Sequence, residues 1–184
     1  MSRCLPVLLL VALACLARLG SARLRPSTPR QRFDGKKHME DCFLSCSDTP
    51  KVAFAASLGG NGLVKTTNGN KDLLYKDVLT NVGGAYNKET GEFTAPIRGV
   101  YYIRFTANAP TDFTMSAVLY KNDAEIQLIA HEQPSGAGSD TASNGGAFLL
   151  EKGDKLKMVL WHNTQIWDNS NHHSTFSGFL LFPM

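Results

Sequence analysis

After residue 50 the chain alternates between apolar and polar positions with a period of two residues. In the clearest run, Tyr101, Ile103 and Phe105 fall on one face of a predicted strand, and their neighbours fall on the other. Shorter runs of the same kind cover 52–56, 126–128 and 155–160. Few windows show the 3.6-residue spacing of a sizeable helix. The pattern predicts an all-β domain over 51–184, built as a β-sandwich or jelly roll.

Turn-forming residues separate these runs. Asn68-Gly69 and Asn122-Asp123 lie between apolar stretches and predict tight turns between strands. The segment Asp168-Asn169-Ser170-Asn171 is wholly polar and predicts a loop before the last strand. Connections of this kind, at intervals of about 8–12 residues, are typical of sandwich and barrel domains.

The last predicted strand is apolar on both faces. Phe176, Leu180 and Phe182 alternate with Phe179 and Leu181. A sandwich strand needs one apolar face for its own core, so the second face must be covered by something else. The pattern leaves two candidates open, which are the protein's own loops and a neighbouring copy of the chain.

The first 22 residues have the features of a secretory signal. Arg3 precedes an apolar run over 5–17 that only Pro6 interrupts, and Gly20-Ser21-Ala22 supplies the small residues of a cleavage site. A membrane anchor is disfavoured, because a span needs about 20 apolar residues and Arg18 ends this run too early. We therefore expect an extracellular protein of 184 − 22 = 162 residues, without membrane insertion.

Residues 23–50 form a basic arm rich in proline that is expected to be flexible or extended. The arm contains Cys42 and Cys46, the cysteines that remain once 1–22 is removed. In an oxidising compartment exposed thiols are expected to form disulfides. The pair could bridge two chains or close a small loop within one chain, and the spacing allows both.

Composition disfavours several functions. Removing Arg3 and Arg18 with the signal leaves 17 − 16 = +1 net charge, which gives no basic face for nucleic acid. No Gly-x-Ser-x-Gly elbow is present, so a hydrolase using His131 with Glu132, or His172 with Asp168, lacks a nucleophile motif. No acidic run has the spacing of a calcium loop, and metal ligands stay unassigned. We expect a protein that is not an enzyme.

Eight spaced positions resemble the signature of the complement C1q globular domain. They are Tyr75-x5-Asn81-x4-Tyr86-x6-Phe93-x5-Gly99-x-Tyr101-x-Ile103-x-Phe105. The family usually has Phe at the positions of Tyr75 and Ile103, and apolar exchanges of this size are tolerated in cores. The resemblance covers 51–184. The segment 174–183 is similar to the closing strand of the cerebellin branch, and Cys42-x3-Cys46 is similar to the element that precedes the cerebellin domain.

This resemblance implies a ten-stranded jelly roll like that of tumour necrosis factor, assembled as a homotrimer. It implies that Cys42 and Cys46 form interchain disulfides, which would allow a linked hexamer. It also implies multivalent binding of cell-surface receptors or adhesion proteins, with recognition of microbial or damaged-cell surfaces as the alternative. No cofactor is expected; some relatives hold calcium, but no ligands are assigned here.

Candidate residues follow from the strand pattern and the resemblance together. The expected core or trimer-interface positions are Tyr101, Ile103, Phe105, Phe176, Phe179 and Leu181. Partner contacts are expected in loops over 106–112, 132–145 and 163–173, because binding residues concentrate in loops held by a rigid scaffold.

Overall fold

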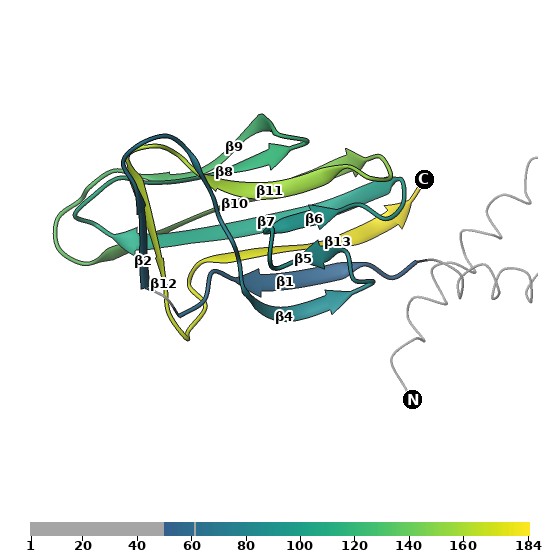
Figure 1. Ribbon diagram of the computed structural model, residues 1–184, viewed down its shortest axis with the longest axis horizontal. Coiled ribbons are helices and arrows are strands. Elements are labelled where there is room, and N and C mark those ends of the chain that lie inside the picture. Colours follow the sequence, from purple (N-terminus) through teal and green to yellow (C-terminus); the bar gives the residue numbers. More distant parts are fainter. Residues whose placement is uncertain (1–49, 61) are drawn as a thin grey trace, which may run out of the picture. The chain divides into compact units, whose positions relative to one another are not determined.

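The computed structural model describes residues 50–60 and 62–184 (Figure 1). The segment 1–22 that was predicted to be a secretory signal, most of the arm 23–50 and both Cys42 and Cys46 lie outside the described residues. The described part contains thirteen strands and no helix, which confirms the all-β prediction. The strands are β1 Ala53–Ser57, β2 Gly62–Thr66, β3 Lys71–Asp72, β4 Asp77–Val82, β5 Tyr86–Asn87, β6 Glu92–Thr94, β7 Gly99–Pro110, β8 Met115–Lys121, β9 Ala124–Glu132, β10 Ser139–Leu150, β11 Lys155–Leu160, β12 Thr164–Asp168 and β13 Thr175–Pro183.

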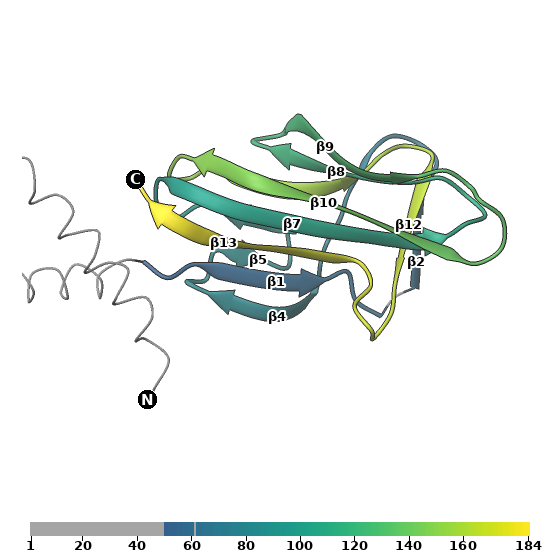
Figure 2. The same cartoon turned by 180° about the vertical axis from the view of Figure 1, so that it is seen from behind.

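Ten of these strands form two layers of five. The first layer has the order β4-β1-β13-β7-β10, and we call it the β7 sheet. The second has the order β5-β6-β11-β8-β9, and we call it the β8 sheet. Strand β12 pairs with β2 and joins the layers through single pairings to β7 and β8, while β3 pairs with β11. Seen from behind in Figure 2, the strands of the β7 sheet lie side by side.

The core lies between the two layers and is rich in aromatic rings. Tyr101, Ile103 and Phe105 of β7 are fully buried, while Arg104 on the opposite face is exposed, so the predicted alternation is confirmed. The Phe54 ring of β1 stacks on Phe93 of β6 at a centroid distance of 4.9 Å. Stacked and edge-on rings add to the apolar area that they remove from water.

The hairpin between β8 and β9 has the tight turn that its residues predict. Asn122 and Asp123 connect Lys121 to Ala124 with positive φ values of 49° and 65°. Two central residues with positive φ match the twist of the flanking strands, and Asn and Asp tolerate this conformation. The tight turn predicted at 122–123 is therefore confirmed.

The expected alternation along β13 is wrong at Phe182. Leu180 pairs with Tyr101, but the next ladder pair joins Phe182 to Val100, because Leu181 is an extra residue in a bulge. A bulge sends the residues that follow it to the opposite face. Phe182 therefore leaves the core face, and 53% of its surface is exposed. A count of every second residue cannot detect such an insertion.

Gly178 of β13 allows a close approach within the core, which makes it a test of the packing. A Cβ atom there would lie 2.5 Å from Ile103 Cδ1 and 2.9 Å from Phe54 Cε1. Gly178→Ala should therefore lower the free energy of unfolding by about 1–3 kcal/mol, measured by urea denaturation. Gly60→Ala is the matched control, since nothing lies within 4 Å of the added methyl group. Equal stability of the two variants would contradict this packing.

Candidate functional site

One row of apolar side chains crosses the outer face of the β7 sheet through all five strands. The register aligns Val82 with Ala53, Ala53 with Phe179, Phe179 with Tyr102, and Tyr102 with Ala147. We call these five residues the apolar row. The rings of Phe179 and Tyr102 lie 5.7 Å apart, and 45% of the surface of Phe179 is exposed. Five segments far apart in the sequence thus contribute to one surface.

The apolar surface continues towards the C-terminus. Leu181 is 46% exposed, and the bulge in β13 adds Phe182 to the same region. Phe182 pairs with Val100, which in turn pairs with Leu149 of β10, another exposed residue. A groove of about 330 Å³ adjoins this end of the row and is lined in part by Val82, Leu181 and Phe182. Contiguous exposed apolar patches of this kind mark interaction sites.

The face becomes polar towards the other end. The next register row contains Thr80, Ala55, Ser177, Arg104 and Gly145. Beyond it, the hydroxyl groups of Thr106 and Thr175 lie 2.8 Å apart. The face therefore passes from apolar side chains through one arginine to hydroxyl groups.

The β8 sheet carries a different surface. Its strands and the adjoining turns hold ion pairs, which are Lys121–Asp154, Lys155–Glu92, Lys157–Asp72 and Lys157–Asp123. Hydrogen bonds from Lys121 and Asn122 lower the pKa of Asp154 to about 2. Charged side chains of this kind suit a face in water. The contrast singles out the outer face of the β7 sheet as the candidate interaction site.

The structure separates the predicted interface candidates into two groups. Tyr101, Ile103, Phe105 and Phe176 are fully buried in the core of the subunit, whereas Phe179 and Leu181 are exposed. Sequence reasoning missed the other residues of this surface, which include Val82, Tyr102, Leu149 and Phe182. The sequence pattern gave little indication of these residues, because their position on one surface depends on the register between strands.

The expected contact loops are shorter than the predicted ranges. Residues 106–110 belong to β7, 139–145 to β10 and 164–168 to β12. These strands are held in ladders, so the connecting segments reduce to 111–114, 133–138 and 169–174. Figure 1 shows these connections away from the end that carries the C-terminus.

The histidine pairs considered for hydrolysis lack the geometry. His172 Nδ1 lies 2.9 Å from Ser57 Oγ, and the Ser57 hydroxyl donates to Asp168 Oδ2 at 3.0 Å. Ser57 and Asp168 are both fully buried, so a substrate could not reach this hydroxyl. His131 Nε2 lies 2.7 Å from Gln133 Nε2, and no hydrogen bond or ion pair among the described residues joins His131 to Glu132. The described residues thus hold no accessible nucleophile and base pair among these candidates.

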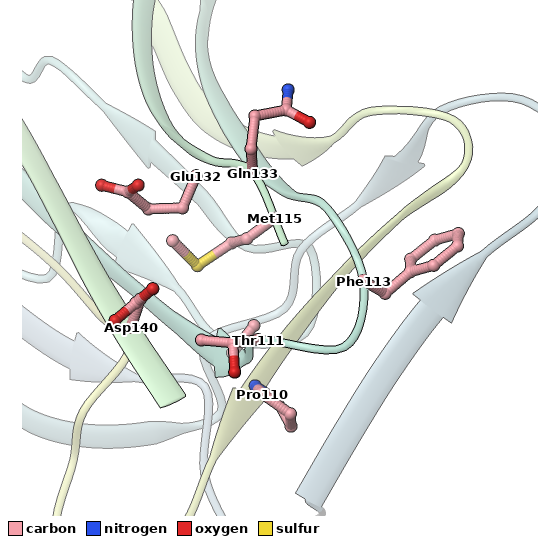
Figure 3. A pocket seen from close by; sticks show the side chains of 8 residues that line it. Pro110, Thr111, Phe113, Met115, Glu132, Gln133 and Asp140 are labelled. Carbon is pink, nitrogen blue, oxygen red and sulfur yellow. The ribbon is translucent and has the colours of Figure 1, made fainter. Parts of the chain in front are cut away.

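A small pocket beside the 111–114 turn offers little room for a ligand. Figure 3 shows the side chains of Glu132, Met115 and Asp140 on one side of it and Phe113 directed away. Its volume of about 10 Å³ corresponds to about one water molecule. Among residues 50–60 and 62–184, no cluster of three or more His, Cys, Asp or Glu side chains could hold a metal ion. The same residues contain no helix that is long and apolar enough to cross a membrane.

Sequence comparison supplies related proteins. Residues 53–181 match one family, the C1q domain. The chain is 30% identical over 132 residues to complement C1q tumor necrosis factor-related protein 3 of Mus musculus, covering 72% of this chain and 52% of that protein. It is 31% identical over 124 residues to a complement C1q subcomponent of Rattus norvegicus, covering 67% of this chain and 45% of that protein. The chain thus spans about half the length of these relatives.

Solved structures with the same fold are more distant in sequence. The globular domain of zebrafish complement 1qA protein matches with a TM-score of 0.55 at 22% identity, covering 73% of this chain and 99% of that one. Murine APRIL matches with a TM-score of 0.57 at 13% identity, covering 71% and 99%. Eiger TNF from S. frugiperda matches with a TM-score of 0.56 at 18% identity, covering 73% and 95%. The predicted jelly roll shared by C1q and tumour necrosis factor proteins is confirmed.

Proposed function

The chain belongs to the C1q domain family, and on this premise we propose that it is a secreted, non-enzymatic protein that assembles as a homotrimer and binds cell-surface receptors or adhesion proteins multivalently. One observation carries the proposal, namely the apolar row on the outer face of the β7 sheet. Neither this sheet nor a connecting segment among the described residues covers Phe179 and Leu181. A second copy of the chain would cover them.

Burial of this face supplies the driving force for assembly. Fully burying a Leu or Phe side chain contributes about 1.5–3 kcal/mol. Phe179, Leu181 and Phe182 are each about half exposed, so covering them contributes about 1 kcal/mol each, and every contact in a closed ring repeats the gain. In a ring of three copies, this face of one copy packs against a different surface of the next.

Multivalency then supplies the binding mechanism. Each copy presents identical connecting segments at 111–114, 133–138 and 169–174. Linking identical sites raises the avidity for a receptor-bearing surface by large factors without new contacts. Secretion through residues 1–22 and interchain bridges at Cys42 and Cys46, which would join trimers into hexamers, are part of the proposal. The proposal includes no cofactor.

Sedimentation of the full chain, expressed in cultured cells and recovered from the medium, tests the proposal. The wild type should sediment at three times the subunit mass, or six times before reduction. After reduction of the interchain disulfides, Phe179→Glu should sediment as a single folded copy, because a buried unpaired carboxylate is strongly disfavoured. The control is Leu63→Glu on β2, since Leu63 is 43% exposed but lies outside the apolar row. A wild type that stays monomeric at all concentrations would contradict assembly.

Binding to receptor-bearing cells tests the multivalent part. The assembled wild type should bind a cell surface much more tightly than monomeric Phe179→Glu, by a factor of about 10²–10⁴. The Leu63→Glu variant should bind like the wild type. Equal binding of the monomer and the assembly would remove avidity from the mechanism.

The second candidate function is recognition of microbial or damaged-cell surfaces. The 31% identity to a complement C1q subcomponent favours it. Fold and assembly are the same in both cases, so the partner alone separates them. A panel that compares bacterial surfaces with intact animal cells distinguishes the two, since a receptor ligand should bind cells and leave bacteria unbound.

A further inference from the structure

A single arginine lies on the proposed assembly face. Arg104 projects from β7 in the register row next to the apolar row, between Ser177 of β13 and Gly145 of β10. Both neighbours are small, and a Cβ at position 145 would already approach Arg104 Cα to 3.1 Å. Arg104 is exposed, and no bulky side chain stands beside it in its register row.

Arg104 has no acidic partner in the part of its own subunit that the structure describes. The ion pairs among residues 50–60 and 62–184 include Arg98 with Glu151 at 2.9 Å, but none includes Arg104. Its free guanidinium is therefore satisfied by solvent as long as the face is exposed.

Covering the apolar row also covers this arginine. Arg104 follows Tyr102 by two residues, a distance of about 6.6 Å along a strand. A surface that packs on Phe179 and Tyr102 thus reaches the guanidinium as well. A charged group that leaves water without an acceptor costs several kcal/mol, which would oppose assembly.

We propose that a carboxylate of the adjacent copy of this chain pairs with Arg104 and fixes how the two copies align. The inference rests on the proposed assembly. A carboxylate is the fitting acceptor, because it can take two parallel hydrogen bonds from a guanidinium. Apolar contacts alone are not directional, whereas such a pair selects one register between the copies.

The chain can supply this carboxylate itself. Three exposed glutamates in the described part make neither an ion pair nor a side-chain hydrogen bond, and they are Glu89, Glu125 and Glu132. None of them belongs to the β7 sheet, since Glu125 and Glu132 lie on β9 and Glu89 lies between β5 and β6. In a ring, the face of one copy meets a different surface of the next, so a carboxylate from outside the face is what the geometry requires.

The direction in which Arg104→Met changes self-association tests the proposal. Arg104→Met keeps the length of the side chain and removes its charge. If a carboxylate pairs with Arg104, the variant leaves that carboxylate buried and alone, and self-association measured by sedimentation equilibrium should weaken at least about thirtyfold. Arg104→Lys keeps the charge but not the planar guanidinium group, so its self-association should be weaker than that of the wild type and stronger than that of Arg104→Met. If no carboxylate is present, Arg104→Met should associate as well as the wild type or better, which overturns the proposal.

Two further measurements complete the test. As dissociated single subunits, the Arg104 variants should have the same thermal midpoint as the wild type, because Arg104 is exposed in the single subunit. Glu→Gln at one of positions 89, 125 and 132 should reproduce the loss, and combining it with Arg104→Met should add nothing further. No effect at any of the three overturns the proposal. A monomeric wild type would instead overturn the assembly itself, so the two failures are distinguishable.

Discussion

Replacing Asp168 by alanine should lower the free energy of unfolding by about 3–5 kcal/mol. Asp168 ends β12 and is fully buried. Its Oδ2 atom accepts hydrogen bonds from the Ser57 hydroxyl and the Gly59 N–H, both at 3.0 Å. Its Oδ1 atom accepts from three backbone N–H groups, those of Asn169, His173 and Ser174.

The physical reason is the number of donors that the alanine variant would leave unpaired. Each buried donor without a partner costs about 1–3 kcal/mol, although part of this is recovered when the segment 169–174 relaxes. The free energy of unfolding of Asp168→Asn should lie between those of the wild type and Asp168→Ala. The amide keeps one acceptor oxygen, but its N–H₂ group faces other donors.

Chemical denaturation of the reduced, isolated domain measures this effect. The control is Asp77→Ala, since the Asp77 carboxylate is half exposed and lies 3.6 Å from His172 Nδ1. An exposed pair of this kind contributes at most about 1 kcal/mol. Similar losses for Asp77→Ala and Asp168→Ala would show that the carboxylate is not the anchor of segment 169–174.

The local pattern of apolar and polar residues was sufficient for the core face of β7 and for the β8–β9 turn. The alternation at 101–105 identified which β7 side chains enter the core, because a strand turns successive side chains to opposite faces. The Asn122-Asp123 turn followed from the preference of these residues for positive φ. The exposure of Phe179 followed from a strand with more apolar residues than one core face can use.

The pattern could not reveal features that depend on distant segments. The apolar row needs the register of five strands, and register is set by pairing that no single window contains. Phe182 was misplaced because a bulge is invisible to a period of two. Asp168 was expected in a polar loop, yet it ends a strand and is buried, because its donors come from β1 and from the segment after β12.

Two phenylalanines three residues apart on β13 should affect different properties when each is replaced by alanine, Phe176 the stability of the subunit and Phe179 its assembly. Phe176 is fully buried, with its ring 4.9 Å from that of Phe54 and 5.8 Å from that of Tyr75. Phe176→Ala should lower the free energy of unfolding of a subunit by about 3–5 kcal/mol, through lost contacts and a cavity that the sheet cannot close. The effect belongs to the subunit, so it should be seen at any protein concentration.

Phe179→Ala should leave the subunit nearly as stable as before, within about 1 kcal/mol, because the side chain is already half in water. Its effect should instead lie in assembly, as a weaker association constant and a concentration-dependent thermal midpoint. Denaturation and sedimentation of both variants at two concentrations separate the two roles. If Phe179→Ala lowered subunit stability and left assembly unchanged, Phe179 would act as a core residue. Both faces of β13 would then stabilise the subunit, and the apolar row would not be an interface.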